Sequence, residues 1–173
     1  GEGHPLPPVT VTVIILEAHT NKSMKIAHES LASVKEDIKP LLEKHWLETE
    51  PNQNTIALDP DWEQYAVLDQ CNILRVFTAR DKGDLVGYCV VLIAKSIHHK
   101  SHTFASTDVI YIKPEYRQSK TGSDLIHYAE KHCKENGVSL MTLNMKTEFP
   151  FDNLMLRMGF NLLERVYHKC FLG

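Results

Sequence analysis

Side chains that could bind an anion follow a strand-like run near the middle of the chain. Residues 109–112 are apolar and β-prone, and the polar turn after them contains Arg117, Lys120 and Gly122. A helical pattern starts directly after this turn, and its apolar residues share one face: Leu125, Ile126, Ala129 and Cys133. A helix in this position presents unpaired N–H groups and the positive end of its dipole beside a sheet, which favours phosphate oxygens. The sequence therefore predicts an anion site, and we expect a phosphorylated cofactor there.

The turn belongs to a segment, residues 114–126, that resembles the acyl-CoA loop of the GNAT family of N-acetyltransferases. The family pattern is roughly P-x-Y-R-G-x-G-x-G-x-x-L, and Arg117 and Gly122 stand at the first and last positions of its loop. Gln118 and Lys120 depart from the pattern, since glycines are usual at both places. The Lys120 side chain could crowd the approach of a pyrophosphate, or its ammonium could add a phosphate contact, and both alternatives stay open.

A second segment, residues 154–160, resembles the family's L-Y-x-K-x-G-F pattern. Helix, glycine and strand in this order also fit Gly159 as the residue that ends a helix. The two segments stand in the family's order, and the resemblance extends over residues 74–171. It implies an α+β fold with a mixed, mostly antiparallel central sheet flanked by helices. It also implies acetyl-CoA as acyl donor and transfer of the acetyl group to an amine of a small molecule or protein in a direct ternary complex.

The resemblance further implies which residues form the cofactor site. Main-chain groups of Ile110 and Ile112 would pair with the pantetheine arm as an added strand does, and an N–H group of that strand would stabilise the oxyanion. The loop would hold the pyrophosphate mainly through backbone atoms. Its residues are Arg117, Gln118, Ser119, Lys120, Thr121, Gly122 and Ser123.

Asp108 is our candidate for the general base. It interrupts the apolar strand two residues before Ile110, where several family members carry a glutamate. A carboxylate beside apolar walls holds a proton more tightly, as a base that works on an ammonium requires. A solvated aspartate at an irregularity of the strand explains the residue equally well. Because aspartate is one methylene shorter than glutamate, the catalytic interpretation includes a relaying water.

The general acid is less well defined, because Met155 occupies the position of the tyrosine that protonates the leaving thiolate in the family. We take Tyr111 as the candidate catalytic substitute, with Tyr167 and water as alternatives. The thiol of CoA is an acceptable leaving group without full protonation. The missing tyrosine therefore places a tyrosine-acid mechanism in doubt without arguing against CoA binding.

The composition is that of one soluble domain. The chain has 173 residues, of which 43% are apolar and 24% charged, enough to bury a proper core. The net charge of −3 provides no basic field, so we expect no nucleic-acid partner. The sequence leaves a homodimer open. The four cysteines are widely spaced without a CxxC pair, which favours free thiols in a cytoplasmic protein; they are Cys71, Cys89, Cys133 and Cys170.

Residues 1–23 are expected to be an extension ahead of a single domain that spans residues 24–173. Residues 9–16 are apolar but too few to cross a bilayer, and no basic leader precedes them, so we expect neither a membrane span nor a signal peptide. This run is either a leading strand or part of a disordered extension. We favour the second, because the residues from Met24 onward already predict a first strand.

Helical patterns dominate up to residue 73. Apolar residues at helical spacing predict a helix over residues 31–46, with Ser30 or Ser33 as its cap. Pro40 should kink this helix or begin a second one. Asp59 and Pro60 then predict the cap and first residue of another helix. We interpret three aromatic side chains of this region as core residues, although the resemblance implies that the region forms one wall of the acceptor site: Trp46, Trp62 and Tyr65.

Strand patterns dominate from residue 74. Residues 74–79 and 85–94 predict a hairpin with its turn at 81–84. The remaining predicted elements are a strand at 104–112, a helix at 121–135, a strand at 138–145, a short helix at 151–158 and a last strand at 161–171. The order of elements favours a mixed sheet flanked by helices.

A loop at residues 97–103 carries His98, His99 and His102. Three close histidines suggest a metal site, but adjacent histidines point apart in an extended chain and no carboxylate or cysteine completes the set. We therefore interpret this segment as a solvated loop.

Two alternatives to catalysis stay open. A non-catalytic acyl-CoA-binding or regulatory domain is suggested by Gln118, Lys120 and Met155, the three departures from the family patterns. A protein-interaction module on the same fold is the second alternative, although no particular residue indicates it.

Overall fold

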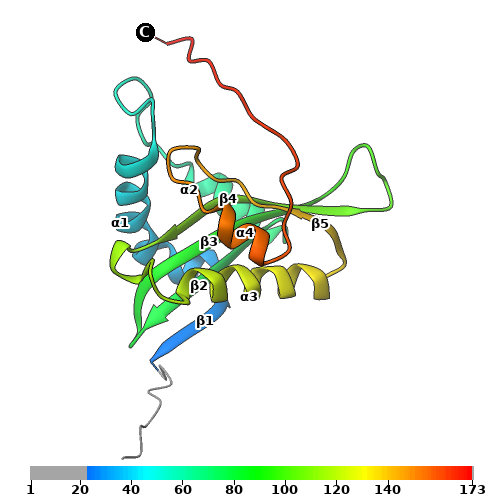
Figure 1. Cartoon of the computed structure of the whole chain (residues 1–173), viewed down its shortest axis with the longest axis horizontal. Helices are drawn as coiled ribbons and strands as arrows, with labels where there is room; N and C mark the ends of the chain where they lie inside the picture. The colour runs from blue at the N-terminus through cyan, green and yellow to red at the C-terminus, as the bar shows by residue number, and fades with distance from the viewer. Residues whose placement is uncertain (1–22, 173) are drawn as a thin grey trace, which may run out of the picture.

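The computed structural model describes residues 23–172 of the chain. Its centre is a five-stranded sheet in the order β1-β2-β3-β4-β5. The strands are β1 (Met24–Glu29), β2 (Leu74–Asp81), β3 (Asp84–Lys95), β4 (Thr103–Ile112) and β5 (Val138–Thr142). The helices are α1 (Leu31–Thr49), α2 (Trp62–Gln70), α3 (Thr121–Glu135) and α4 (Asp152–Arg157). In Figure 1, α3 and α4 lie in front of the sheet and α2 lies behind it.

The sheet is mixed. β1 to β4 pair antiparallel with their neighbours, whereas β5 runs parallel to β4. The predicted fold class, a mixed and mostly antiparallel sheet flanked by helices, is therefore confirmed. The predicted extension lies almost wholly outside the described residues, and so does the apolar run at 9–16.

Two apolar clusters fill the two faces of the sheet. On one face, Val34 and Ile38 of α1 pack with Leu74, Tyr88 and Tyr111 of the strands. The cluster on the other face joins α3 to β2, β3 and β4, and its fully buried members include Phe77, Cys89, Ala105, Leu125 and Ala129. The one-sided helical stripe predicted for α3 is thus confirmed as the stripe that covers the sheet.

α1 is one helix, so the alternative of a second helix starting at Pro40 is wrong. Ser30 caps its first turn by accepting a hydrogen bond from the Ser33 N–H at 3.3 Å. Pro40 lies on the exposed side of the helix, where water can reach the carbonyl that the proline ring leaves without an N–H partner.

α2 begins later than predicted. Asp61, rather than Asp59, is the cap, because its Oδ1 accepts the Gln64 N–H at 2.9 Å and the helix starts at Trp62. The predicted hairpin between β2 and β3 is correct. Its two turn residues, Lys82 and Gly83, have φ of 51° and 96°, and positive φ at both positions is what a tight two-residue hairpin turn requires.

The predicted last strand, residues 161–171, is wrong. No strand forms there, and the segment runs from α4 in an extended path that ends away from the sheet (Figure 1). A strand needs a neighbour for its backbone groups, and in the described residues no other strand pairs with this segment. β5 is also shorter than its predicted range of 138–145.

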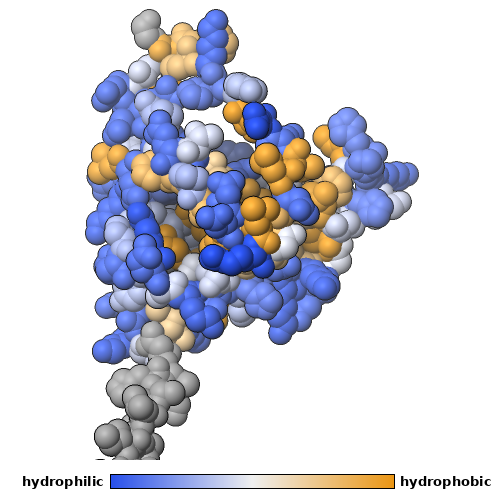
Figure 2. Space-filling model, in the orientation of Figure 1, coloured by the Kyte–Doolittle hydropathy of each residue, from blue (hydrophilic) through white to orange (hydrophobic). Residues whose placement is uncertain are grey.

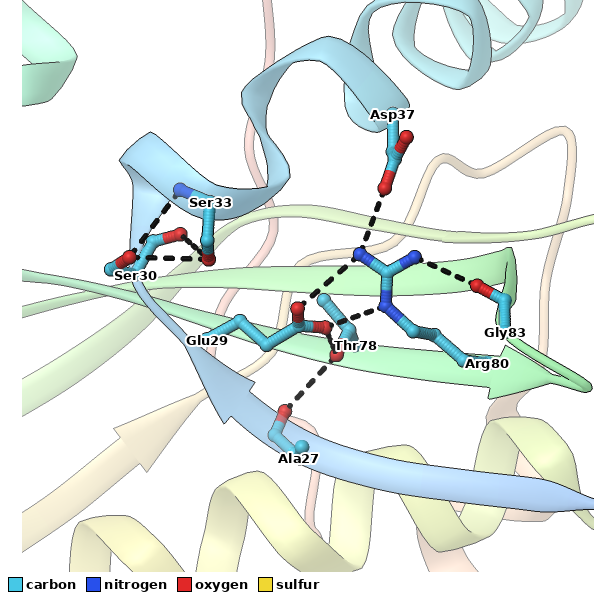
Figure 3. Close-up of polar contacts among 8 residues, drawn as sticks. All are labelled: Ala27, Glu29, Ser30, Ser33, Asp37, Thr78, Arg80 and Gly83. Atoms are coloured by element: carbon cyan, nitrogen blue, oxygen red, sulfur yellow. Dashed lines mark hydrogen bonds and ion pairs between the residues drawn. The ribbon is translucent and has the colours of Figure 1, made fainter.

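A polar cluster ties β1, β2 and α1 together (Figure 3). The Arg80 guanidinium donates from Nε to Glu29 Oε2 at 2.9 Å and from Nη2 to Asp37 Oδ2 at 2.8 Å. The Thr78 hydroxyl donates to the same Glu29 carboxylate. Burial raises the pKa of Glu29, but the hydrogen bonds from Arg80 and Thr78 outweigh it and leave that pKa below its usual value.

The Glu29 carboxylate should therefore stabilise the fold in a pH-dependent way. A carboxylate whose pKa is lower in the folded than in the unfolded chain stabilises the fold at pH values above its pKa in the unfolded chain. This stabilisation is lost as the pH falls through its pKa in the folded chain. We expect Glu29→Gln to lower the free energy of unfolding by about 1.5 kcal/mol at pH 7, with a smaller deficit at pH 4. Urea unfolding at both pH values measures this.

Glu36→Gln is the matched control, because Glu36 is exposed and its hydrogen-bond and ion-pair partner among the described residues is the neighbouring Lys39 of the same helix. It should leave the unfolding curve unchanged. An equal deficit for Glu29→Gln at both pH values would contradict the assigned role of the ionised carboxylate.

Candidate functional site

Asp108 lies at a β-bulge in β4. Val90 of β3 pairs with Val109 and Val91 pairs with Thr107, so Asp108 is the extra residue between them. A one-residue insertion exchanges the faces to which side chains point. Before the bulge, Ala105 packs with the α3 cluster, whereas Val109 after the bulge packs with the α1 cluster. The predicted strand irregularity is therefore present at Asp108.

The Asp108 carboxylate is directed to α2. Its Oδ2 accepts a hydrogen bond from the Tyr65 hydroxyl at 2.7 Å. Burial raises the pKa of Tyr65, and the hydrogen bond to Asp108 raises it further, so the phenol stays protonated and donates. Asp108 itself is exposed, although the apolar side chains of Leu68 and Leu92 line the same groove.

A groove of about 350 Å³ opens beside this pair of side chains. Its polar lining comes from Asp61, Gln64, Tyr65 and Asp108, and its apolar lining from Pro60, Leu68 and Leu92. A second hollow of about 400 Å³ shares Pro60 with it and is lined by Trp46 and Trp62 among others. Both tryptophans are half-buried. Trp62 packs against the α1 cluster, as does Tyr65, in agreement with the expected core packing, whereas Trp46 is not among the residues of that cluster.

β4 and β5 pair over only part of their length. Their parallel pairing ends at Ser106 and Thr142. Beyond that point, Asn144 contacts Thr107 through two hydrogen bonds, from its N–H to Thr107 Oγ1 at 2.9 Å and from Nδ2 to the Thr107 carbonyl at 3.1 Å. The part of β4 that follows Thr107 is therefore left without a β5 neighbour.

The main-chain groups of Ile110 and Ile112 face this open side of β4. The Lys113 N–H donates to the Val86 carbonyl at 2.9 Å, which directs Lys113 toward β3. Residues of an antiparallel strand alternate in the side to which their N–H and carbonyl groups point. The groups of Ile112 and Ile110 therefore point away from β3, as an added strand would require.

The loop and the start of α3 supply N–H donors close to the open strand. The Ser119 hydroxyl accepts the Thr121 N–H at 3.2 Å, so this donor is already used. The N–H groups of Gly122 and Ser123 make no hydrogen bond to another described residue. A Cβ at Gly122 would lie 3.8 Å from Ile112 Cγ1. The protein itself therefore leaves room for a side chain there.

Arg117 is held by protein groups. Its Nη1 and Nη2 donate to the two Glu48 oxygens at 2.6 and 2.7 Å, and its Nε donates to the Ile112 carbonyl at 2.9 Å. Its guanidinium also lies 5.5 Å from the centre of the Tyr111 ring. Hydrogen bonds from Arg117 lower the pKa of Glu48. Arg117 thus joins the loop to α1 and to the end of β4.

The side chain of Lys120 is 88% exposed, and its ammonium is 4.0 Å from Asp124 Oδ1. This geometry leaves the ammonium able to reach a ligand at the loop. Gln118 is also exposed. Within the described residues, neither the Gln118 nor the Lys120 side chain makes a hydrogen bond to an N–H group at the start of α3.

The two candidate tyrosines, and the methionine that stands at the family's tyrosine position, lie in different environments. Tyr111 is buried in the α1 cluster, on the face of β4 to which Asp108 is also directed, and burial raises its pKa. Met155 is buried within α4, whereas Tyr167 is 88% exposed on the segment after it. Tyr111 therefore shares a face of β4 with Asp108, whereas Tyr167 lies on another segment.

Sequence reasoning missed three residues that position the site: Glu48, Tyr65 and Asn144. Each acts on a residue at least 37 positions away, so no local pattern identified it. Tyr65 carried one usable signal, because it lies on the helix that the family resemblance implied as a wall of the acceptor site.

No cluster of three or more histidine, cysteine, aspartate or glutamate side chains in residues 23–172 could hold a metal ion. His102 contacts Ser139 through Nδ1 at 2.8 Å. Within the same residues, no helix has the length and apolar character to cross a membrane. The four cysteines are free thiols.

Comparison with known proteins defines the class of the chain. A sequence model of the Acetyltransferase (GNAT) family matches residues 35–160. This match covers well over half of the chain, which therefore belongs to the GNAT family of acetyltransferases. A search of curated proteins found no match.

Solved structures of the same family share the fold. An aminoglycoside acetyltransferase from an uncultured soil metagenomic sample, in complex with sisomicin, has a TM-score of 0.68 at 16% identity, over 87% of this chain and 97% of that chain. A ribosomal-protein-alanine N-acetyltransferase from Brucella melitensis has a TM-score of 0.62 at 20% identity, over 87% and 99%. A predicted acetyltransferase with acetyl-CoA from Clostridium acetobutylicum has a TM-score of 0.66 at 12% identity, over 85% and 96%.

The contact between Tyr65 and Asp108 can be tested without any ligand. Asp108→Asn removes the negative charge beside the phenol, so we expect the pKa of Tyr65 to fall, while burial, the larger cause, keeps it above the ordinary value. At pH 11, a larger fraction of Tyr65 should be ionised in Asp108→Asn than in the parent protein. Tyrosine carbon-13 NMR, with the Tyr65 signal assigned through Tyr65→Phe, measures this fraction.

Asp84→Asn, which removes a carboxylate from the hairpin turn, is the control and should leave the Tyr65 signal unchanged. An unaltered Tyr65 fraction in Asp108→Asn would mean that the two side chains do not interact in solution.

Proposed function

We propose that the protein is an N-acetyltransferase that transfers an acetyl group from acetyl-CoA to an amine in a direct ternary complex. The observation that carries this proposal is the open edge of β4, with Asp108 on one side and the N–H groups of Gly122 and Ser123 beyond its end. Membership of the GNAT family supports the same activity, and a neighbour solved with acetyl-CoA supports the donor. The free thiols suit a reducing compartment, so we propose the cytoplasm.

The chain offers acetyl-CoA two kinds of backbone contact. The N–H and carbonyl groups of Ile110 and the N–H group of Ile112 would pair with the amides of the pantetheine arm, as an added strand does, whereas the Ile112 carbonyl accepts Arg117 Nε. The first turn of α3 would hold the pyrophosphate through the N–H groups of Gly122 and Ser123 and the positive end of the helix dipole. Lys120 would add a mobile positive charge, while Arg117 would keep the loop and β4 together.

Acetyl-CoA supplies the activated thioester. Asp108 would take the proton of the acceptor amine, directly or through one water, as the nitrogen forms its bond to the acetyl carbon. An N–H group on the open edge of β4 would stabilise the oxyanion. The carbon–sulfur bond then breaks and its electron pair leaves with the thiolate, which takes a proton from water or from Tyr111. Tyr65 would hold the Asp108 carboxylate in the required orientation.

The groove beside Asp108 would bind the acceptor. Asp61 and Asp108 are the only charged residues among the groove's lining, so its field favours a cationic amine over an anionic molecule. The apolar side chains of Leu68 and Leu92 would contact the carbon atoms of the acceptor. One structural neighbour is an aminoglycoside acetyltransferase bound to sisomicin, which is consistent with an amine acceptor.

A non-catalytic acyl-CoA-binding domain is the second candidate. Met155 at the position of the family's tyrosine and the side chains of Gln118 and Lys120 in the loop favour it. Release of CoA thiol over a panel of amines separates the two candidates. Binding without turnover would support the second.

Gly122→Val tests the cofactor loop. A ligand at a hundred times its Kd stabilises the folded state by about 2.7 kcal/mol, so acetyl-CoA should raise the melting temperature of the parent protein. The valine side chain would occupy the space that the phosphates need and should reduce this shift. Lys134→Val, on the exposed side of the same helix, should retain it. An undiminished shift in Gly122→Val would refute the loop assignment.

Asp108→Asn tests the base. The variant should bind acetyl-CoA as the parent protein does but lose about a hundredfold or more in kcat at pH 7. The loss should shrink as the pH rises, because a free amine needs no base. Tyr65→Phe should lower kcat by a smaller factor, whereas Tyr128→Phe on α3 should not change it. Unchanged turnover of Asp108→Asn across the pH range would exclude Asp108 as the base.

A further inference from the structure

Both tryptophans of the chain line one hollow. Trp46 lies on α1 and Trp62 is the first residue of α2, and both side chains belong to the lining of the hollow of about 400 Å³. We call it the Trp46 hollow. Both side chains are half-buried, so each keeps apolar ring surface exposed to water. A planar apolar group that covers this surface would be stabilised by burial and by contacts between the rings.

The lining of the Trp46 hollow is apolar apart from one charge of each sign. Lys39 and Glu43 of α1 supply these charges, and the Lys39 ammonium lies 5.9 Å from the centre of the Trp62 ring. A tryptophan face attracts cations, but Lys39 already takes this position at Trp62 and would repel a second cation. The hollow therefore favours a neutral group. Its other side chains are apolar: Leu42, Leu58 and Pro60.

The Trp46 hollow adjoins the groove beside Asp108, because Pro60 lines both. The centres of the Trp62 and Tyr65 rings are 5.6 Å apart, and the Tyr65 hydroxyl donates to Asp108 Oδ2 at 2.7 Å. One tyrosine side chain thus separates the tryptophan from the candidate base. A short aliphatic linker would be enough to join an amine at Asp108 to a ring at Trp62.

Another apolar surface lies elsewhere on the molecule. Figure 2 shows apolar residues gathered where Figure 1 places α4 and the first part of the segment after it. None of the residues that line the Trp46 hollow comes from that part of the chain. The Trp46 hollow, rather than that surface, shares a lining residue with the groove of Asp108.

The groove and the hollow differ in charge. The charged residues that line the groove, Asp61 and Asp108, are both acidic, whereas the Trp46 hollow carries one charge of each sign. An ammonium therefore gains more in the groove, and an uncharged ring is the better occupant of the hollow. The two adjoining spaces suit a molecule with a cationic amine at one end and an apolar ring at the other.

We propose that the acceptor is a primary arylalkylamine, with its amine at Asp108 and its ring against Trp46 and Trp62. The assignment rests on the N-acetyltransferase activity proposed above and names the class of acceptor. The amine nitrogen forms the bond to the acetyl carbon, the carbon–sulfur bond of the thioester breaks, and the products are an N-acetylated arylalkylamine and CoA thiol. Trp46 is then a residue that determines specificity and takes no part in proton transfer.

Intrinsic fluorescence tests the ring site without turnover, because both tryptophans of the chain line the hollow. Phenylethylamine should change the tryptophan emission of the full chain in a saturable way. Propylamine, which has the same ammonium but no ring, should bind about tenfold more weakly or less. Equal responses to the two amines, or no response to phenylethylamine, would overturn the proposal.

Turnover gives the second measurement, with acetyl-CoA as donor and release of CoA thiol as readout. The kcat/KM for phenylethylamine should exceed that for propylamine and for a polyamine by about tenfold or more. Turnover that favours the polyamine or propylamine would overturn the arylalkylamine assignment and leave the proposed function intact. If no amine releases CoA thiol, the proposed function fails, and the fluorescence titration still decides whether the hollow binds a ring.

Trp46→Ala links the preference to the hollow. Its loss of kcat/KM should be about tenfold larger for phenylethylamine than for propylamine. Leu58→Gln, in the loop before α2, should act in the same direction and provides the test if Trp46→Ala does not fold. Leu47→Ala is the matched control, because Leu47 follows Trp46 on α1, is 54% exposed and lines neither space. Equal losses for both amines in Trp46→Ala and Leu58→Gln would overturn the proposal, since the hollow would then serve the fold alone.

Discussion

The bulge at Asp108 is the constraint on which the rest of the site depends. Side chains in a strand alternate with a period of two, so one inserted residue moves everything after it to the opposite face. Because of the bulge, Ala105 faces α3 while Val109 and Tyr111 face α1. The same insertion directs the Asp108 carboxylate to Tyr65 on α2. Without it, the strand would have a regular ladder and no carboxylate at the groove.

The open edge beyond the bulge has a second physical consequence. Backbone N–H and carbonyl groups need partners, and the pairing of β4 with β5 stops at Ser106. Asn144 satisfies Thr107 where the strands separate. The Ile112 carbonyl accepts Arg117 Nε, which leaves the Ile110 groups and the Ile112 N–H to water or to a ligand with its own amides. A strand-like molecule with a phosphorylated end suits this edge, because the donors at the start of α3 lie beyond it.

Local patterns in the sequence predicted several helices, strands and turns correctly. Contacts between residues that are distant in the chain were not predicted. The hairpin turn at Lys82 and Gly83 and the range of α3 were correct, since each follows from residues close together in the chain. The fold class was correct because the family resemblance and the order of elements along the chain both indicated it. The contact of Tyr65 with Asp108 spans 43 positions and that of Glu48 with Arg117 spans 69, so neither could be derived from spacing. The predicted strand at 161–171 failed for a related reason, because strand composition does not provide a neighbour.

Arg117 shows how the fold limits the roles that a family pattern assigns. Two of its nitrogens bind Glu48 and a third binds the Ile112 carbonyl, so its charge is balanced by a carboxylate within the protein. A phosphate at the loop would then gain less from this guanidinium than the pattern implies, and more from the N–H groups of α3 and from Lys120, whose side chain is exposed. Since Glu48 belongs to α1, the same ion pair also joins the helix that lines the Trp46 hollow to the loop that contains Arg117. Arg117 therefore contributes to the site more by holding α1 and β4 in place than by direct contact with an anion.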